Sequence, residues 1–286
     1  MFRREMRAAG KWKISVLAAV AATFAFAAPA SAADELLPAA SYPDMTTYSC
    51  HTDAIQIHPG QNLNLLGQTK TCPNAQKISG PGDTSVFAPG STASGYITRF
   101  KPSMLEIQPD GKLTTPSVWD LHLHHVVWVG PNGPTFASGE EETTAKLPQG
   151  YGYKTGGDQT WVLNYMIHSL NAIPNRQVYI TWEIDWVPET TPARTDIHQA
   201  TVQWLDVAGS PHLYPVFDAE PKYDTNNDGR YQFPDEVPTD PSMPGYEQRQ
   251  NVSQAASWTF NQPKTLVFGA GHLHPGGMHV DLQVAR

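Results

Sequence analysis

The residues with the clearest chemical potential are three histidines that fall within four positions, His122, His124 and His125. Imidazole nitrogen binds copper, zinc, iron and nickel alike, so such a group predicts a transition-metal site. On a regular strand His122 and His124 lie on one face, and His125 points to the other. Adjacent histidines can therefore share one metal ion only where the strand bends or ends. The alternative is polar alternation on a solvated strand face.

Further histidines follow along the chain. His168 closes an apolar segment that begins at Trp161; a single histidine there is also typical of a sheet rim, where its hydrogen bonds are satisfied. His272 and His274 form an H-x-H motif, which can present two nitrogen ligands from one strand to one metal ion. His279, after a Gly-Gly turn, is a spare candidate ligand.

An oxygen-rich loop over residues 224–235 follows the pattern D-x-[DN]-x-[DN]-G. In calcium loops of this spacing, oxygen ligands recur at alternate positions and a carboxylate returns at position 12. We expect calcium to be bound by the main-chain carbonyl of Arg230 and by the side chains of Asp224, Asn226, Asp228 and Asp235. The role of this calcium is expected to be structural. The alternative is an ordinary Asx-rich turn, because the same residues favour turns without metal.

The order of the histidine clusters resembles the ligand order of the type II, ascorbate-dependent copper monooxygenases, the family of peptidylglycine α-hydroxylating and dopamine β-monooxygenases. Residues 124–127, His-His-Val-Val, are similar to the family's histidine pair entering an apolar strand. Residues 162–168 resemble its strand that ends in a third histidine. Residues 272–277, His-Leu-His-Pro-Gly-Gly, resemble its H-x-H followed by glycine, and plant stress-up-regulated nodulin proteins carry a similar stretch. The likeness is specific in these three short segments.

This resemblance implies two jelly-roll-like β-sandwiches, each holding one copper ion across a solvent cleft. It implies that His124, His125 and His168 bind the copper that transfers electrons. His272 and His274 match two ligands of the copper that binds oxygen. In the family that second copper also takes a Met from a strand well downstream of H-x-H, whereas twelve residues follow His274 here. Either the sequence is truncated, or the second domain is short or incomplete and its site is altered.

Strand patterns would position these histidines. Alternating and β-branched or aromatic runs recur along the chain, whereas helical periodicity is scarce. The expected strands cover residues 118–124, 126–129, 160–167, 178–186, 264–270 and 278–284. The predicted class is all-β. We expect an N-terminal β-sandwich domain over residues 33–190 and a second, partial β domain over residues 191–286.

Residues 1–32 have the pattern of a signal peptide: a basic start, an apolar run too short to span a membrane, and an A-x-A site that ends at Ala32. An N-terminal membrane anchor is the alternative. Cleavage removes five basic residues and one acidic residue, so the net charge of −8 becomes −12. This acidic balance argues against a nucleic-acid or anionic-membrane partner. We expect a secreted, extracellular protein.

The chain has two cysteines, Cys50 and Cys72. Export to oxidising surroundings predicts a disulfide between them, which would close a short N-terminal loop. Two reactive thiols are the alternative.

Three functions are consistent with these features. The leading hypothesis is an exported copper-binding protein, with up to two copper ions, that hydroxylates a substrate C–H bond with O₂ and an ascorbate-like reductant. Its substrate, a small molecule or a peptide, is not readable from the sequence. The second is a non-catalytic secreted protein that binds copper or zinc on the same scaffold. The third is a β-sandwich adhesion module that contains calcium and carries incidental histidines.

Overall fold

The structure is a computed structural model, and it describes residues 38–190, 192, 194–204, 222–223, 227, 229, 231–232, 259–272 and 282. The expected signal peptide over residues 1–32 lies outside these residues. The strands are β1 (Thr46–His51), β2 (Ile55–Ile57), β3 (Asn64–Lys70), β4 (Gln76–Ser79), β5 (Ser94–Ile107), β6 (Leu113–Thr114), β7 (Leu121–Gly130), β8 (Gly133–Gly139), β9 (Ala145–Lys146), β10 (Tyr151–Gly156), β11 (Thr160–Ser169), β12 (Arg176–Pro188), β13 (His198–Gln199), β14 (Lys222–Tyr223) and β15 (Tyr231–Gln232). Within the described residues, the only helix is the short 3-10 helix η1 (Thr84–Phe87).

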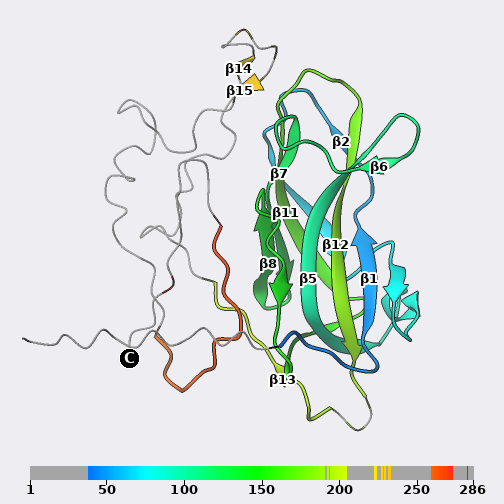
Figure 1. The fold of residues 1–286 in the computed structure, drawn as a ribbon, viewed down its shortest axis with the longest axis vertical. Coiled ribbons are helices and arrows are strands. Elements are labelled where there is room, and N and C mark those ends of the chain that lie inside the picture. The colour runs from blue at the N-terminus through cyan, green and yellow to red at the C-terminus, as the bar shows by residue number, and fades with distance from the viewer. Residues whose placement is uncertain are drawn as a thin grey trace, which may run out of the picture. The chain divides into compact units, whose positions relative to one another are not determined.

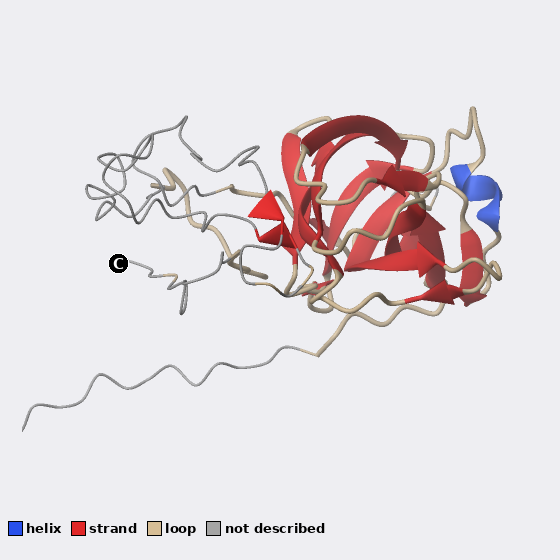
Figure 2. Ribbon diagram, turned by 90° about the horizontal axis from the view of Figure 1, so that it is seen from above, coloured by secondary structure: helices blue, strands red, loops and turns tan. Residues whose placement is uncertain are grey.

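Most of the strands belong to two sheets (Figure 1). The large sheet has nine strands and follows the order β13-β10-β5-β12-β1-β4, while β2 pairs with β12 and both β6 and β9 pair with β5. The small sheet has four strands in the order β3-β11-β7-β8. Figure 2 shows the same strands from above. Outside these two sheets, β14 and β15 pair with each other.

Aromatic side chains between the two sheets form the core. Phe100 of β5 meets Trp128 of β7 edge-on with ring centroids 4.8 Å apart, and it stacks on Phe136 of β8 at 4.1 Å. Trp182 of β12 lies 5.4 Å from Trp128. Because Phe100 and Trp182 belong to the large sheet, and the other two residues to the small sheet, these contacts join the sheets into a β-sandwich.

The strand β12 illustrates how the sequence specifies this packing. Its alternate residues Val178, Ile180, Trp182, Ile184 and Trp186 are all buried. Successive side chains of a strand point to opposite faces, so a period of two places this apolar set in the core. The strand predicted over residues 178–186 is therefore confirmed.

The all-β sandwich class is confirmed by the two sheets. The strands expected over residues 126–129 and 160–167 lie within β7 and β11. The prediction for residues 118–120 is wrong, because these residues form a turn that precedes β7. In that turn the main-chain N–H groups of Asp120 and Leu121 donate to the Ser117 carbonyl, and Trp119 is 73% exposed.

The prediction of a strand over residues 264–270 is also wrong. These residues are described and have no strand conformation, and most of their side chains are exposed. An extended segment is stabilised as a strand only where a neighbour takes up its N–H and C=O groups, and none of the described sheets includes this segment. Of residues 278–284, the structure describes only 282. The two predicted domains, 33–190 and 191–286, stay a prediction.

The two cysteines form the predicted disulfide, Cys50–Cys72. Cys50 belongs to β1 of the large sheet, and Cys72 follows β3 of the small sheet by two residues. Both are buried, so the bridge joins the two sheets inside the sandwich. Such a bridge is compatible with an exported protein. In the part of the chain that the structure describes, no helix has the length and apolar character needed to cross a membrane.

Candidate metal centre

A β-bulge in β7 brings several histidines together. In the pairing of β7 with β11, His125 lies opposite Met166, whereas the next residue of β11, Ile167, lies opposite Leu123. His124 is therefore the extra residue of a bulge. A bulge bends its strand and changes the direction in which side chains point, so the period of two is interrupted at this position.

The bulge corrects the face assignment that a regular strand predicts. His122 lies opposite His168 and His125 lies opposite Met166, and residues directly opposite each other point to the same side of a sheet. Since Met166 and His168 are two positions apart on β11, they share a face, and so do His122 and His125. The ring of His124 stacks on His168 on that face. The alternation of a regular strand, which would point His125 away from the other two histidines, does not apply here, because the extra residue shifts His125 by one position.

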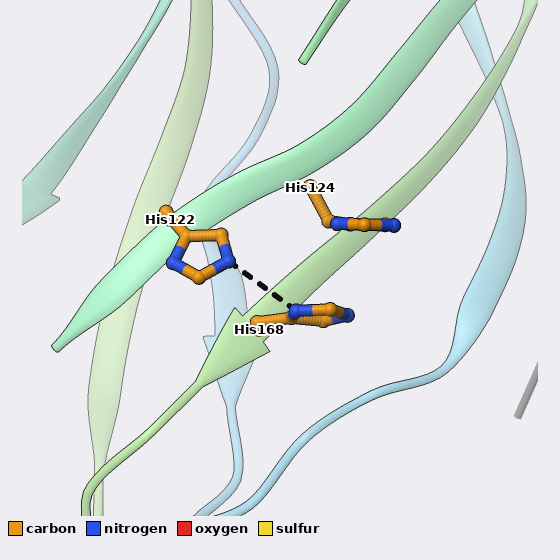
Figure 3. A group of neighbouring side chains, drawn as sticks. All are labelled: His122, His124 and His168. Carbon is orange, nitrogen blue, oxygen red and sulfur yellow. Dashed lines mark hydrogen bonds between the residues drawn. The ribbon is translucent and has the colours of Figure 1, made fainter. Parts of the chain in front are cut away.

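Three of these residues, His122, His124 and His168, form a group that could hold a metal ion (Figure 3). One ligand nitrogen from each lies within 4.8 Å of the other two. Nε2 of His122 is 3.3 Å from Nδ1 of His168. The rings of His124 and His168 are nearly parallel, with centroids 4.2 Å apart. The expected convergence of His168 with His124 is present, although the two lie on different strands.

The turn before β7 fixes the orientation of His122. Its Nδ1 lies 2.6 Å from the carbonyl oxygen of Val118. A carbonyl oxygen only accepts hydrogen bonds, so Nδ1 carries the proton and donates it. The other ring nitrogen, Nε2, faces His168. Metal-binding histidines are oriented in this way, with the second nitrogen bonded to a carbonyl or carboxylate.

Burial keeps His168 in the neutral form that a metal ligand needs. Its fractional exposure is 7%. Desolvation is the main cause that lowers the pKa of His168 to about 2, and the neighbouring His124 and His122 lower it further. Burial disfavours the charged imidazolium because the interior solvates charge poorly. His168 can therefore bind a cation without first releasing a proton at neutral pH.

A carboxylate that sequence reasoning missed lies beside the group. Oε1 of Glu140 is 3.1 Å from Nε2 of His122 and 3.9 Å from Nδ1 of His124. Hydrogen bonds from these two rings lower the pKa of Glu140 well below its ordinary value. Glu140 follows β8, whose last residue, Gly139, lies opposite His125. The signal was available, since a hairpin turn near Gly130 folds residue 140 back onto the histidines.

His125, an expected copper ligand, lies on the same face but is not a member of the group. Its Nε2 is 3.1 Å from Oδ1 of Asn64 on β3, and its ring centroid is 5.4 Å from that of His124. His122, which the family resemblance leaves unassigned, completes the group instead. The role of His125 as a copper ligand stays a prediction.

His272, the first residue of the H-x-H motif, also lies near this edge of the small sheet. Its ring centroid is 6.5 Å from that of His124. Its Nδ1 is 3.3 Å from one carboxylate oxygen of Glu141 and 3.4 Å from the other. The second residue of the motif, His274, lies outside the described residues, as does the spare candidate His279.

The expected calcium ligands Asp224, Asn226, Asp228, Arg230 and Asp235 all lie outside the described residues. Four of the intervening residues are described, and two of these, Asn227 and Gly229, have a positive φ, 55° and 71° respectively. The strand β14 directly precedes the loop, and its partner β15 lies within it. Calcium binding stays a prediction.

Comparisons with known proteins give no match among family models, curated proteins or solved structures. The functional assignment therefore starts from the geometry of the histidine group.

Proposed function

We propose that this chain is an exported protein that binds a copper ion through His122, His124 and His168. The observation that carries this proposal is the buried group of three imidazoles, whose ligand nitrogens lie within 4.8 Å of one another. Three imidazoles suit copper, and zinc is the alternative metal because it accepts the same ligands. The order of the histidines along the chain, which resembles that of the type II copper monooxygenases, favours copper.

The chain's own residues prepare this site for a cation. Val118 orients His122 through its main-chain carbonyl, and burial holds His168 neutral. The bulge at His124 adds a third ring from the same strand as His122. A copper ion held by imidazoles can change between Cu(I) and Cu(II), which would supply one-electron chemistry.

A second candidate function is hydroxylation of a substrate C–H bond with O₂ and an ascorbate-like reductant. The position of His272 favours it, because this first residue of the H-x-H motif lies beside the histidine group. A second copper held by His272 and His274 is part of this candidate. Its substrate would be a small molecule or a peptide.

Metal titration tests the binding proposal. Mature protein stripped with a chelator should take up a stoichiometric Cu²⁺ ion, with nitrogen hyperfine structure in the electron paramagnetic resonance spectrum. The variant His122→Ala/His124→Ala should lose this uptake. His58→Ala, which removes an exposed histidine of the same sandwich, should retain it. Copper uptake that persists in the double variant would contradict the proposal. If the wild-type protein bound zinc stoichiometrically but no copper, zinc would be the metal of this site.

Ascorbate-dependent oxygen uptake tests the hydroxylase candidate separately. The copper-loaded protein should consume oxygen faster than His122→Ala/His124→Ala does under the same conditions. Stoichiometric copper without oxygen uptake would leave metal binding in place and remove the enzymatic function.

A further inference from the structure

The nitrogen Nε2 of His122 faces two other atoms that can bind a metal ion. Nδ1 of His168 lies 3.3 Å from it, and Oε1 of Glu140 lies 3.1 Å from it. The opposite nitrogen of the same ring, Nδ1, donates to the carbonyl of Val118 at 2.6 Å. With Nδ1 engaged by Val118, Nε2 is the nitrogen that faces both neighbours.

A metal ion bound at Nε2 of His122 would also lie next to Oε1 of Glu140, because only 3.1 Å separates these two atoms. The carboxylate could then bind the same ion, and its negative charge would favour a cation there.

Two separations at Nε2 of His122 approach those between the ligands of a tetrahedral ion. Zinc binds imidazole nitrogen and carboxylate oxygen at about 2.0–2.2 Å, so neighbouring ligands of a tetrahedral ion are roughly 3.3–3.6 Å apart. The two separations at Nε2 of His122, 3.3 Å and 3.1 Å, lie close to that range. The separation of 3.9 Å between Oε1 of Glu140 and Nδ1 of His124 is larger than this range.

We infer that Glu140 is a fourth metal ligand, so that the site has three imidazoles and one carboxylate and selects a divalent cation over Cu(I). This inference rests on the proposed metal-binding function and adds the specificity of the site. Carboxylate oxygen is a hard ligand that favours Cu²⁺ or Zn²⁺, whereas Cu(I) favours soft ligands. Glu140 therefore stabilises the oxidised form of a copper centre.

The neighbouring glutamates provide a matched control. Glu142 directs its carboxylate elsewhere, because its Oε1 accepts a hydrogen bond from Ser103 at 3.0 Å. Glu140→Gln and Glu142→Gln each remove one negative charge from the same acidic turn. Only Glu140→Gln changes an atom that faces His122.

The experiment compares the affinities of Zn²⁺, Cu²⁺ and Cu⁺ for mature wild-type protein, Glu140→Gln and Glu142→Gln, by competition with chelators. We expect Glu140→Gln to lower the affinities for Zn²⁺ and Cu²⁺ about 10- to 100-fold, the range found when groups around a metal site are removed. The affinity for Cu⁺ should change by no more than about threefold. The Cu²⁺ resonance spectrum should change in Glu140→Gln and stay as in the wild type in Glu142→Gln.

Two results would overturn the inference: unchanged divalent affinity in Glu140→Gln, or an equal loss of all three ions. Circular dichroism of both variants checks that the sandwich is folded. Wild-type protein that binds no metal stoichiometrically would overturn the proposed function, and the ligand role of Glu140 with it. Wild-type binding that Glu140→Gln retains in full would overturn the ligand role alone.

Discussion

At the scale of single residues, the surroundings of each histidine decide what it can do. His122 is oriented by a carbonyl on one nitrogen and faces His168 with the other. His125, three positions on, bonds the amide oxygen of Asn64 instead. An amide oxygen only accepts, so Nε2 of His125 carries a proton and donates it. Neighbouring histidines on one strand thus differ in which nitrogen has a lone pair available.

The buried His168 makes the stability of the metal-free protein depend on pH. Its pKa is about 2 in the folded chain, below the ordinary value of about 6.5 that it regains on unfolding. Between these values the unfolded chain binds the additional proton, so stability falls as the pH drops below about 6.5. Between pH 6.5 and pH 5, we expect the unfolding free energy of the wild type to fall by about 1–2 kcal/mol more than that of His168→Asn.

Urea unfolding in the presence of a chelator, at pH 7, 6 and 5, measures this effect. His58→Asn, at an exposed position, is the control and should keep the wild-type slope. An unchanged slope in His168→Asn would show that burial of this ring does not cause the pH dependence.

At the scale of elements, the site depends on how β7 and β8 pair. The bulge places His124 on the face of its neighbours, and β8 returns Glu140 to that face. A glycine at the end of β8 leaves room for this arrangement. A Cβ atom on Gly139 would lie 2.5 Å from Cε1 of His272 and 2.7 Å from the carbonyl oxygen of His124. Close approach of three segments therefore requires glycine here.

Gly139→Ala should displace both His124 and His272, which lie closest to the added Cβ atom. We expect a loss of about 1–3 kcal/mol in unfolding free energy, the usual effect of overpacking, together with weaker Cu²⁺ binding. Gly67→Ala in β3 is the matched control, because a Cβ atom there meets nothing within 4 Å. Urea unfolding and copper titration of both variants give the comparison. Equal behaviour of the two variants would refute the packing argument.

The pairing of β5 with β12 includes a nearly buried ion pair, Arg176–Glu106. Two hydrogen bonds of 2.6 Å and 2.9 Å join the guanidinium to the carboxylate. Glu106→Gln should destabilise the protein by about 3–5 kcal/mol, because it leaves a buried charge without its partner. Arg176→Met/Glu106→Leu should recover most of this loss. Lys101→Met, at an exposed ion pair with Glu183, should change the unfolding free energy by less than about 1 kcal/mol.

Urea unfolding of the wild type and these three variants measures the differences in unfolding free energy. If Glu106→Gln were no more destabilising than Lys101→Met, the Arg176–Glu106 pair would behave as a solvent-exposed ion pair.

At the scale of the whole molecule, the two sheets are held together by the aromatic core and by one covalent link. The disulfide Cys50–Cys72 joins residues 22 positions apart and encloses β2 and β3. Because β3 pairs with β11, the closed loop includes a strand next to the one that carries His168. The three histidines of the candidate metal centre lie outside this loop.

Removing the disulfide should therefore lower stability more than it alters the site. We expect Cys50→Ala/Cys72→Ala to reduce the unfolding free energy by about 3 kcal/mol, through the greater freedom of the unfolded chain. Its Cu²⁺ affinity under native conditions should remain within about threefold of the wild type, since β7 and β11 keep their partners. Urea unfolding and copper titration test both expectations. If the variant lost copper binding while it was still fully folded, the disulfide would be needed for the metal site itself.

The all-β class, the positions of the main strands and the disulfide could be predicted because they follow from local patterns. Alternation in residues 178–186 specifies a strand with one face in the core, whatever its partners are. The segment 264–270 has apolar residues too, yet it is not a strand, because strand formation also needs a neighbour for its main-chain groups. Pairing between distant segments is not encoded in the composition of either one.

The candidate metal centre shows the same division between local and long-range information. By itself the sequence determined that histidines would be concentrated on the strand β7 and at the end of β11. Tertiary structure decided which of them meet, because a single extra residue at His124 changes the face of every side chain beyond it. It also brought in Glu140, which reaches His122 only because β8 folds back on β7. Ligand identity depends on distances between strands, and those distances are set by register and packing rather than by residue type.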